Sequence, residues 1–310
     1  MQHIRKAIIP AAGFGTRLLP ATKSQPKEML PVGRKPCVQH IVEELVSEGV
    51  EQILFVTGQG KTAIENHFDR VPELERQLLQ SGRFELLREV EFKSPVRFFY
   101  TRQGAPNGLG DAVLHGKEFA GDAPHLVALG DSIIAGSVVP GLVRRMCAAF
   151  FETGADAVLA VQLVEPSEVH RYGIVAPAGG VLTEIPFTVS HVVEKPSPAN
   201  APSRFAIAGR YVFSPRIFDA LERTVPQRGG EVQLTDAIQI LINQGAKVVA
   251  VPLEGDEVRY DIGNFADYFK TFIRFAAEDP EYGPQVREEM ARILGGRGPR
   301  AGHSQGGGTS

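Results

Sequence analysis

A loop near the start of the chain has the residues needed to hold phosphate groups. Its small residues leave backbone N–H groups free to surround phosphate oxygens; they are Ala11, Ala12, Gly13, Gly15 and Thr16. Arg17 closes this run, and Lys27 follows in the same segment. Two cationic side chains beside a series of free backbone donors predict a polyphosphate ligand.

Two aspartates further along the chain could hold a divalent cation. Asp131 follows the apolar stretch Leu126–Leu129, and Asp261 follows Val258–Tyr260. Either residue alone is more often a turn aspartate that caps the next element. As a pair in a chain with a phosphate loop they become candidate Mg²⁺ ligands, because one or two carboxylates, phosphates and waters usually complete a Mg²⁺ shell. We expect both at exposed ends of strands.

Two neighbouring residues could bind a sugar phosphate. Lys195 would be a third cation for phosphate, and Glu194 could accept hydrogen bonds from sugar hydroxyls. Adjacent side chains on a strand point to opposite faces, so both reach one site only where the strand ends or twists. Pro196 supplies a reason for the strand to end there.

A base could be recognised by Gln103, whose side chain offers one donor group and one acceptor. Gly108 and Gly110 follow closely, and residues without a side chain let a base approach the backbone.

Two better-known phosphate loops do not fit. A dinucleotide-binding loop needs a third glycine where Leu18 stands, and Pro20 prevents the immediate helix. A Walker A loop needs a glycine where Phe55 stands, so Lys61 is expected to be a solvated residue at a helix start. A glycine-rich connection with unrelated cations remains the simpler alternative for the first loop.

The elements that position these residues alternate between strand and helix. This order predicts an α/β fold with parallel βαβ units and helices on both faces of the sheet. Ligands of such sheets bind at the carboxyl ends of strands, where the first loop and Asp131 both fall. Short strands are expected between residues 172 and 211. The expected helices are Pro36–Gly49, a long arm from Thr62 to Glu91, Leu109–Phe119, Pro140–Glu152, Pro215–Glu222 and Leu234–Gly245.

Composition limits the partners. A net charge of −3 argues against a nucleic-acid or membrane-surface binder, and no apolar run approaches the ~18 residues of a membrane span. Cys37 and Cys147 have no metal or redox spacing, which predicts free thiols in a reducing cytoplasm.

We expect one domain over 1–294, followed by a disordered tail over 295–310. Within the domain we expect a nucleotide half of about 1–165, a half of about 166–280 that holds the sugar and the second metal ligand, and a helix of about 281–294.

Six motifs carry a resemblance to a known family. In chain order they are Ala11–Arg17, Pro26–Pro31, Tyr172-Gly173, Glu194–Pro196, Glu231–Ile238 and Tyr260–Asn264. Together they resemble the sugar-1-phosphate nucleotidyltransferases, and within them the bacterial UTP–glucose-1-phosphate uridylyltransferases. The resemblance runs from about residue 4 to 280. It implies a Rossmann-like nucleotidyltransferase fold with a mixed, mostly parallel sheet and a smaller β-rich sugar-binding part.

The resemblance also implies the reaction. Glucose 1-phosphate would attack the α-phosphorus of UTP directly, giving UDP-glucose and pyrophosphate with Mg²⁺ and no covalent intermediate. The partners would be these substrates and further copies of the chain, in a homodimer or homotetramer. The resemblance implies that uracil is bound by the Ala11–Gly13 loop, Gln103 and Gly108, and that the β- and γ-phosphates are bound by Arg17 and Lys27. The metal would be held by Asp131 and Asp261. Glucose would be lined by Tyr172, Gly173, Glu194 and Gly209, and its phosphate would be bound by Lys195.

The chain departs from the family pattern at two places. Asp111 stands where a histidine is common, and Ser132 follows the metal-site aspartate in a form closer to the thymidylyl branch. A relative that uses dTTP or another hexose 1-phosphate is therefore an alternative. A catalytically silent nucleotide-sugar sensor is a more distant one, since a sensor has no need for the complete set of charged residues.

Overall fold

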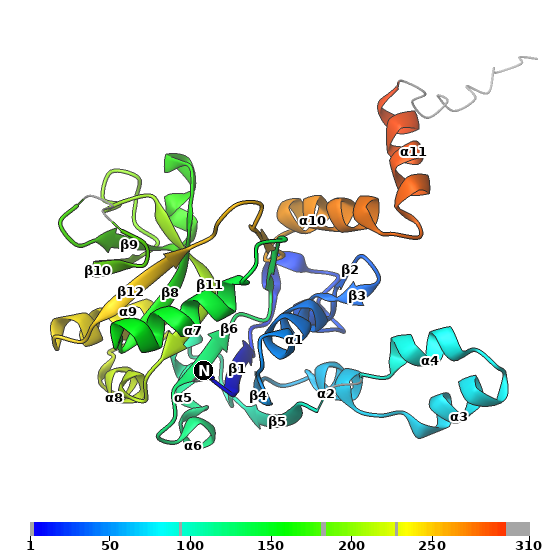
Figure 1. Cartoon of the computed structure of the whole chain (residues 1–310), viewed down its shortest axis with the longest axis horizontal. Helices are drawn as coiled ribbons and strands as arrows, with labels where there is room; N and C mark the ends of the chain where they lie inside the picture. The colour runs from blue at the N-terminus through cyan, green and yellow to red at the C-terminus, as the bar shows by residue number, and fades with distance from the viewer. Residues whose placement is uncertain (1–2, 93–94, 181–183, 227–228, 296–310) are drawn as a thin grey trace, which may run out of the picture.

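A nine-stranded mixed sheet runs through the protein (Figure 1). The computed structural model describes residues 3–92, 95–180, 184–226 and 229–295. The strand order is β5-β4-β1-β6-β11-β8-β12-β10-β9. The bounds are β1 Lys6–Ala11, β4 Gln52–Thr57, β5 Arg97–Arg102, β6 His125–Ala128, β8 Ala157–Leu163, β9 Gly173–Pro177, β10 Phe187–Glu194, β11 Phe205–Phe213 and β12 Val248–Pro252.

The sheet combines parallel and antiparallel pairing, and its second part includes the parallel pair β8 and β12. The strands β5, β4, β1 and β6 are parallel, as the alternation of strands and helices predicts. β11 is antiparallel to both β6 and β8, and β9 and β10 continue in antiparallel pairing. The mixed α/β fold is therefore confirmed. β11 belongs to the second half of the chain yet lies in the middle of the sheet, so both halves share one sheet.

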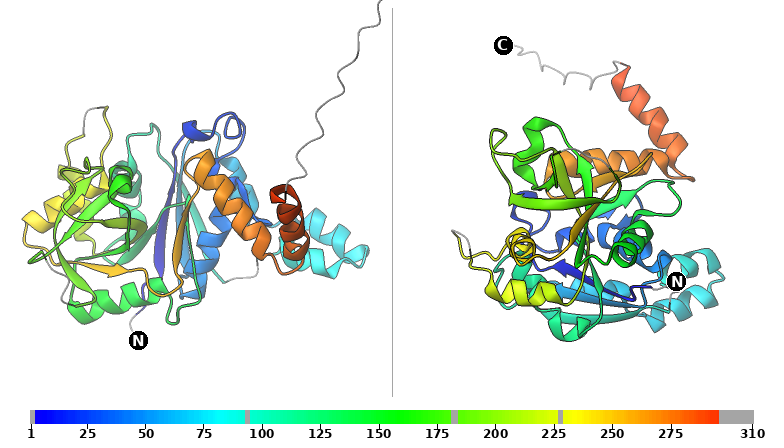
Figure 2. Two further views of the ribbon diagram at one scale, coloured as in Figure 1. Left: turned by 90° about the horizontal axis from the view of Figure 1, so that it is seen from above. Right: turned by 60° about the vertical axis from the view of Figure 1, so that its left-hand side comes forward.

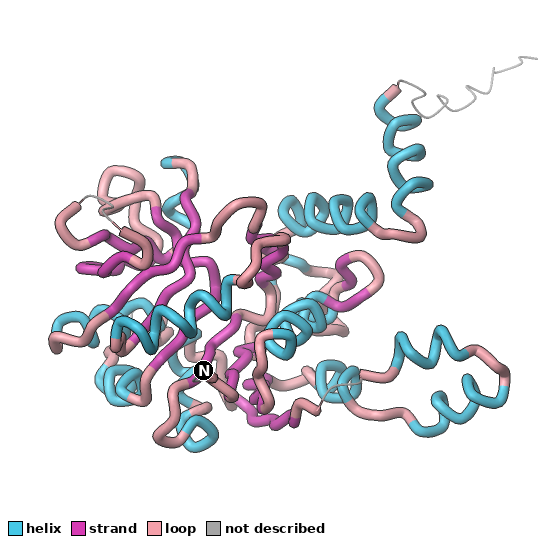
Figure 3. Tube along the Cα trace, viewed as in Figure 1, coloured by secondary structure: helices cyan, strands magenta, loops and turns pink. Residues whose placement is uncertain are grey.

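Helices cover both faces of the sheet (Figures 1 and 3). Along β1, Ala7 and Ile9 pack into one apolar core and Ile8 into the other, because successive strand residues alternate between faces. The first core also receives the apolar side chains of α1 (Cys37–Ser47), α2 (Thr62–Phe68) and α7 (Leu142–Thr153). The second receives those of α5 (Leu109–Leu114), α8 (Arg216–Arg223) and α9 (Leu234–Asn243).

Several helices are shorter than the sequence pattern predicts. The arm expected as one helix consists of α2, α3 (Pro72–Gln80) and α4 (Phe84–Val90). Asp69 is extended between the first two, and Gly82 has a positive φ between the last two. The helix expected over 109–119 divides into α5 and α6 (Lys117–Ala120). Gly116 lies at the break, where a Cβ atom would come 2.3 Å from the side chain of Ile8.

Two helices follow the last strand, and the second of them projects from the body of the molecule (Figures 1 and 2). They are α10 (Phe265–Glu278) and α11 (Gly283–Leu294); the second matches the helix expected near 281–294. Of the expected disordered tail, all but Gly295 lies outside the described residues. Among the helices that the structure does describe, none combines the length and apolar character needed to cross a bilayer.

A separate two-stranded ribbon joins two distant parts of the chain. β7 (Ser132–Ala135) pairs antiparallel with β13 (Val258–Asp261), and Asp261 stands opposite Ser132 in the register. The backbone N–H of Ile262 also donates to the carbonyl of Asp131 at 3.1 Å. The ribbon therefore brings Asp131 and Asp261 to the same end of one small element. A second ribbon, β2 (Pro31–Val32) with β3 (Lys35–Pro36), closes the first loop.

A buried arginine is hydrogen-bonded to the first residue of the β7–β13 ribbon. Arg210 on β11 has no exposed surface. Its guanidinium donates to Glu44 of α1 at 2.6 Å and to the carbonyl of Ser132 at 2.9 Å. A buried charge is tolerated only when it is paired and hydrogen-bonded in this way. Arg210 thus ties the sheet, α1 and the start of β7 together.

Candidate active site

A cavity of about 710 Å³ opens beside the carboxyl ends of β1 and β6. Twelve of the sixteen residues singled out from the sequence line it: Ala12, Gly13, Arg17, Lys27, Gln103, Gly108, Asp131, Tyr172, Gly173, Glu194, Lys195 and Asp261. The other four, Ala11, Gly15, Thr16 and Gly209, are not among the described residues that line it. The structure thus brings most of the residues predicted from the sequence together in one cavity.

The first loop packs around the stem of Lys27. Gly15 has φ +66°, and a Cβ atom there would lie 3.3 Å from the Cβ of Lys27. At Gly13 the nearest atoms to such a Cβ would be the Cε and Nζ of Lys27, at 4.0 Å. Gly15 therefore lets the loop pack against the stem of Lys27, while Gly13 faces the cavity next to the ammonium group.

The ammonium group of Lys27 forms an ion pair with Asp131, and the two side chains are 18% and 20% exposed. Burial alone would lower the pKa of Lys27, but the carboxylates of Asp131 and Glu28 outweigh it and raise the pKa above its ordinary value. Burial would likewise raise the pKa of Asp131, but the Lys27 charge holds it below its usual value. Both groups are therefore charged in the folded protein.

A second buried ion pair lies beneath this one. Lys61 donates to Glu28 at 2.7 Å, and the two side chains are 7% and 1% exposed. The expectation of a solvated Lys61 was wrong. The reason is tertiary: the start of α2 packs under the first loop, where Glu28 offers the only carboxylate bonded to this ammonium among the described residues. Lys61 thereby holds Glu28, the residue that follows Lys27, in place.

The second aspartate is held by an arginine that the sequence reasoning missed. Arg259 donates to Asp261 at 3.0 Å and to the hydroxyl of Ser132 at 2.8 Å. The Asp261 side chain is 24% exposed, so the expectation of aspartates at exposed strand ends was wrong for both residues. The side chains of Lys27 and Arg259 pair with Asp131 and Asp261, respectively, and limit their exposure. Arg259 and Asp261 are two residues apart on one strand and share a face, a signal that could have identified the arginine.

Arg17 approaches the same aspartate from the first loop. A Cβ atom on Gly263 would lie 3.2 Å from the Nη2 of Arg17 and 2.8 Å from a carboxylate oxygen of Asp261. The small residue at 263 therefore lets the guanidinium and the carboxylate lie close together. Asn264 then caps α10 by accepting from the N–H of Asp267 at 3.1 Å.

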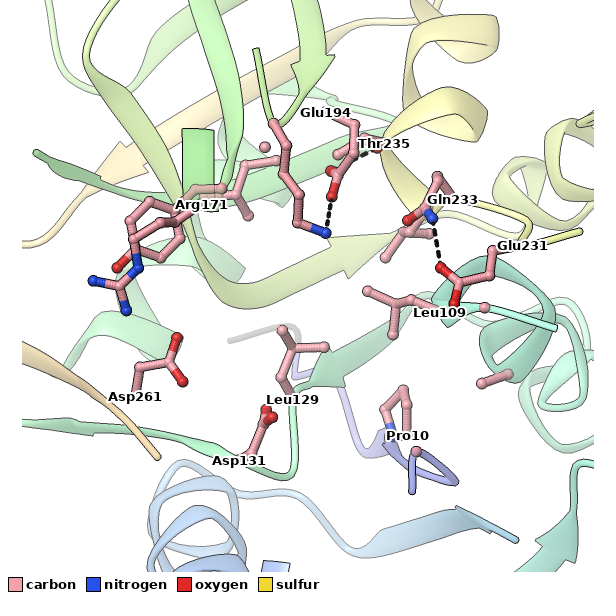
Figure 4. Close-up of a pocket in the computed structure, with 18 of the residues that line it drawn as sticks. Pro10, Leu109, Leu129, Asp131, Arg171, Glu194, Glu231, Gln233, Thr235 and Asp261 are labelled. Carbon is pink, nitrogen blue, oxygen red and sulfur yellow. Dashed lines mark hydrogen bonds and ion pairs between the residues drawn. The ribbon is translucent and has the colours of Figure 1, made fainter. Parts of the chain in front are cut away.

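Lys195 and Glu194 both face the cavity because the strand ends between them. Glu194 is the last residue of β10, and Lys195 has φ +43°, the only positive φ of a non-glycine residue in the described ranges. Their side chains form an ion pair at 2.9 Å, and Thr235 of α9 donates to Glu194 at 3.0 Å (Figure 4). The expectation that a strand end would bring both residues to one site is confirmed.

The ring of Tyr172 lies close to two guanidinium groups. Arg259 is 4.8 Å and Arg171 is 5.3 Å from the ring centre, each within range of a cation–π contact. Burial raises the pKa of the Tyr172 hydroxyl, and the two arginines oppose this effect. Gly173 follows, and a Cβ atom there would lie 2.7 Å from Thr235 and 3.3 Å from Glu194. Only glycine lets β9 approach Glu194 this closely.

Gly209 lies behind the cavity instead of lining it. A Cβ atom there would lie 3.2 Å from the side chain of Leu129, and its carbonyl accepts from the N–H of Leu129 at 3.0 Å. With φ +79° it forms part of an irregularity in β11. Its contact with the segment before Asp131 explains why it does not reach the cavity.

Gln103 and Gly108 lie together in the lining of the cavity. The side-chain nitrogen of Gln103 donates to the carbonyl of Gly108 at 3.1 Å and to the carboxylate of Asp111 at 2.6 Å. Gly108 has φ +100°, and a Cβ atom there would lie 2.6 Å from the carbonyl of Val232. The Val232 backbone thus requires a glycine at position 108, whether or not a base also approaches there, as the sequence suggested.

Other described residues also line the cavity, although the sequence suggested no role for them. They are Pro10, Glu28, Pro106, Leu109, Ala112, Leu129, His170, Arg171, Ile207, Tyr211, Glu231, Gln233, Leu234, Thr235 and Arg259. Three of them, Glu231, Gln233 and Thr235, belong to a motif that was used only to support the resemblance. Figure 4 shows Gln233 bonded to Glu231, and Thr235 to Glu194, on the side of the cavity away from Asp131.

The donor set fits a divalent cation that shares its ligands with phosphate. Asp131 and Asp261 face one cavity, and Arg17, Lys27 and Lys195 surround it. Within the described ranges no group of three or more His, Cys, Asp or Glu residues could form a complete protein cage. Two carboxylates with open positions for phosphate and water suit a cation that binds together with a nucleotide.

Comparison with known proteins gives a consistent result. A family model described as nucleotidyl transferase matches residues 6–278. The chain is 46% identical over 295 residues to UTP–glucose-1-phosphate uridylyltransferase of Bacillus subtilis, covering 95% of this chain and 98% of that protein. The UTP-bound UGPase from Acinetobacter baumannii superposes with a TM-score of 0.85 at 35% identity, covering 94% and 99% of the two chains. A UDP-glucose pyrophosphorylase complexed with UDP-glucose gives 0.77 at 33% identity, covering 88% and 98%.

Proposed function

This chain belongs to the nucleotidyl transferase family, and on that premise we propose that it transfers a uridylyl group from UTP to glucose 1-phosphate. The products are UDP-glucose and pyrophosphate. The observation that carries the proposal is the convergence of three cations and two aspartates on one cavity that also holds Glu194 and Gln103. A protein that only sensed a nucleotide sugar would need no such complete set of charges.

The first half of the chain, to about residue 165, holds the nucleotide. Gln103 and the Ala12-Gly13 backbone contact the uracil, and Arg17 and Lys27 bind the β- and γ-phosphates. Asp131 and Asp261 hold Mg²⁺, which when bound neutralises charge on the phosphate groups. Lys27 already neutralises Asp131 in the ligand-free protein, so the phosphates and the cation enter a site that is close to charge balance.

The second half, from about residue 166 to 280, holds the sugar phosphate. Glu194 accepts hydrogen bonds from glucose hydroxyls, Tyr172 and Gly173 line the ring, and Lys195 binds the phosphate. The attacking oxygen of glucose 1-phosphate is already anionic, so no general base is required. The protein accelerates the in-line attack by positioning the two substrates and by neutralising charge.

A coupled assay of pyrophosphate release tests this function. UTP, dTTP, CTP, ATP and GTP are each combined with several hexose 1-phosphates in the presence of Mg²⁺. We expect the highest kcat/KM with UTP and glucose 1-phosphate, weaker use of dTTP and poor use of CTP. Highest activity with dTTP would assign the chain to the thymidylyl branch. No pyrophosphate from any pair, with folded protein, would contradict an enzymatic function.

We also propose that the protein acts as a homo-oligomer in the cytoplasm. Helices α10 and α11 carry large apolar side chains that remain exposed, which is typical of an interaction surface; they are Phe269, Phe272, Ile273, Ile293 and Leu294. The free thiols of Cys37 and Cys147 are compatible with a reducing compartment. We propose that this surface binds a second copy of the chain.

Light scattering on the full-length protein tests the oligomer. We expect a dimer or tetramer, and we expect Phe269→Ser combined with Phe272→Ser to shift it toward monomer. The matched control is Lys270→Ala, which changes an exposed polar residue of the same helix. A monomer at micromolar concentration, or an assembly unaffected by the double substitution, would rule out this surface.

A further inference from the structure

The side-chain amide of Gln103 has both of its hydrogens engaged. Gln103 is only 6% exposed, and its own backbone N–H donates to Thr57 at 2.9 Å. Its Nε2 donates to Asp111 at 2.6 Å and to the carbonyl of Gly108 at 3.1 Å. An amide nitrogen carries two hydrogens, so Nε2 has none left for a ligand.

The chemistry of the two partners fixes which way the amide points. A carboxylate and a backbone carbonyl can only accept hydrogen bonds. Turning the amide over would place its oxygen against both acceptors and lose two hydrogen bonds in a buried setting. The Oε1 atom is therefore directed away from Asp111, and no described residue donates a hydrogen bond to it.

The partners of Gln103 are themselves held in place. Gly110 donates to the carbonyl of Val232 at 2.8 Å, and Val232 donates to Asn107 at 2.7 Å. The positive φ of Gly108 and its close approach to Val232 allow only glycine in this turn. Asp111 follows in the first turn of α5, so the turn and the helix together present two acceptors to Gln103.

We propose that Asp111 is a specificity-determining residue that acts through Gln103. By engaging the amide hydrogens, it leaves Gln103 as a pure hydrogen-bond acceptor toward the base. Uracil and thymine carry an N3–H that can donate to this acceptor, whereas cytosine presents a lone pair at N3. The inference rests on the proposed function, because it assumes that Gln103 faces the base of a pyrimidine nucleotide.

This arrangement differs from what the sequence suggested. Gln103 was expected to offer one donor and one acceptor to the base, but the donor is spent within the protein. The O4 atom of uracil must therefore be recognised by another group or by water. Selection against cytosine then depends on a single acceptor whose direction is set by Asp111, a residue at which the chain departs from its family pattern.

The experiment compares kcat/KM for UTP and CTP, with glucose 1-phosphate and Mg²⁺, in the full-length protein and its variants. In Asp111→Ala, Gln103 can turn its nitrogen toward N3 of cytosine. We expect the UTP-to-CTP ratio to fall by about tenfold to a hundredfold, the size of one mispaired buried hydrogen bond. Asp111→Asn keeps an oxygen that can accept from Gln103 and should retain most of the ratio.

A double-mutant cycle separates this role from a structural one. Gln103→Ala should lower the ratio as Asp111→Ala does, and the double variant should lower it no further, because both changes remove the same contact. The matched control Glu118→Ala changes an exposed acid on the next helix and should leave the ratio unchanged. Thermal melting of each variant verifies folding.

Two results would overturn the inference. One is an equal loss for UTP and CTP in Asp111→Ala; the other is an effect that adds to that of Gln103→Ala. Calorimetric binding of UTP and CTP to the same variants gives the ratio even if turnover is absent. Failure of the unsubstituted protein to release pyrophosphate with any nucleotide would instead contradict the proposed function, while the binding ratios still decide the role of Asp111.

Discussion

Replacing either Asp131 or Asp261 by alanine is expected to lower turnover on the order of a thousandfold, because each change removes one of the two carboxylates that we propose as ligands of the cation. The loss should appear in kcat with saturating UTP, and more Mg²⁺ should recover it only in part. Binding of Mn²⁺, followed by electron paramagnetic resonance in the presence of UTP, should weaken in parallel. Both readouts report the same ligand set.

The two variants should differ in stability. Asp131→Ala leaves the half-buried Lys27 without its closest partner, whereas Asp261→Ala frees Arg259, which keeps its hydrogen bond to Ser132. We therefore expect the larger fall in melting temperature for Asp131→Ala. Asp122→Ala, at an exposed turn after α6, is the matched control and should change neither property. Activity near the original level in Asp131→Ala would exclude that residue from the metal site.

Replacing Lys195 should separate activity from stability. Its φ of +43° is unfavourable for any residue with a Cβ atom and costs about 1–2 kcal/mol. Lys195→Gly relieves this strain and removes the charge, so we expect a higher melting temperature together with a loss of activity of roughly a hundredfold or more. The loss should fall mainly on the use of glucose 1-phosphate, with binding of UTP nearly unchanged.

Lys195→Ala keeps the strain and removes the charge, so it should match the glycine variant in activity but not in stability. The control is Lys117→Ala, a partly exposed lysine that is paired with Glu222 in the same manner. Its loss should leave activity unchanged because Lys117 is not among the described residues that line the cavity, and it should change stability little because exposed ion pairs contribute little. If Lys195→Gly retained the original kcat/KM for glucose 1-phosphate, Lys195 would not bind the sugar phosphate.

Local patterns, together with the family resemblance, predicted twelve of the residues that line the cavity. The glycines before Lys27 and the proline after Lys195 mark places where the chain must turn, and turns at strand ends are where side chains of such sheets meet. Glu194 and Lys195 illustrate this, because a strand that ends between them is visible in the sequence and is what the structure contains.

Contacts between distant segments could not be predicted in this way. Lys61 is buried because α2 packs beneath the first loop, and no local pattern reveals its partner Glu28. Arg210 interrupts an otherwise apolar strand, and its burial depends on Glu44 of α1. The amide of Gln103 likewise loses its free donor to Asp111 only because a helix begins beside it. Polar residues in buried positions depend on tertiary partners that sequence spacing does not encode.

The β7–β13 ribbon also determines when the site can exist during synthesis. Asp131 leaves the ribosome well before Asp261, and the strand that pairs with β7 belongs to the later segment. Contacts between segments far apart in the sequence form late, because the intervening chain must first be ordered. A growing chain therefore displays its phosphate loop before it has a second carboxylate. Catalytic competence is among the last properties that the nascent protein acquires.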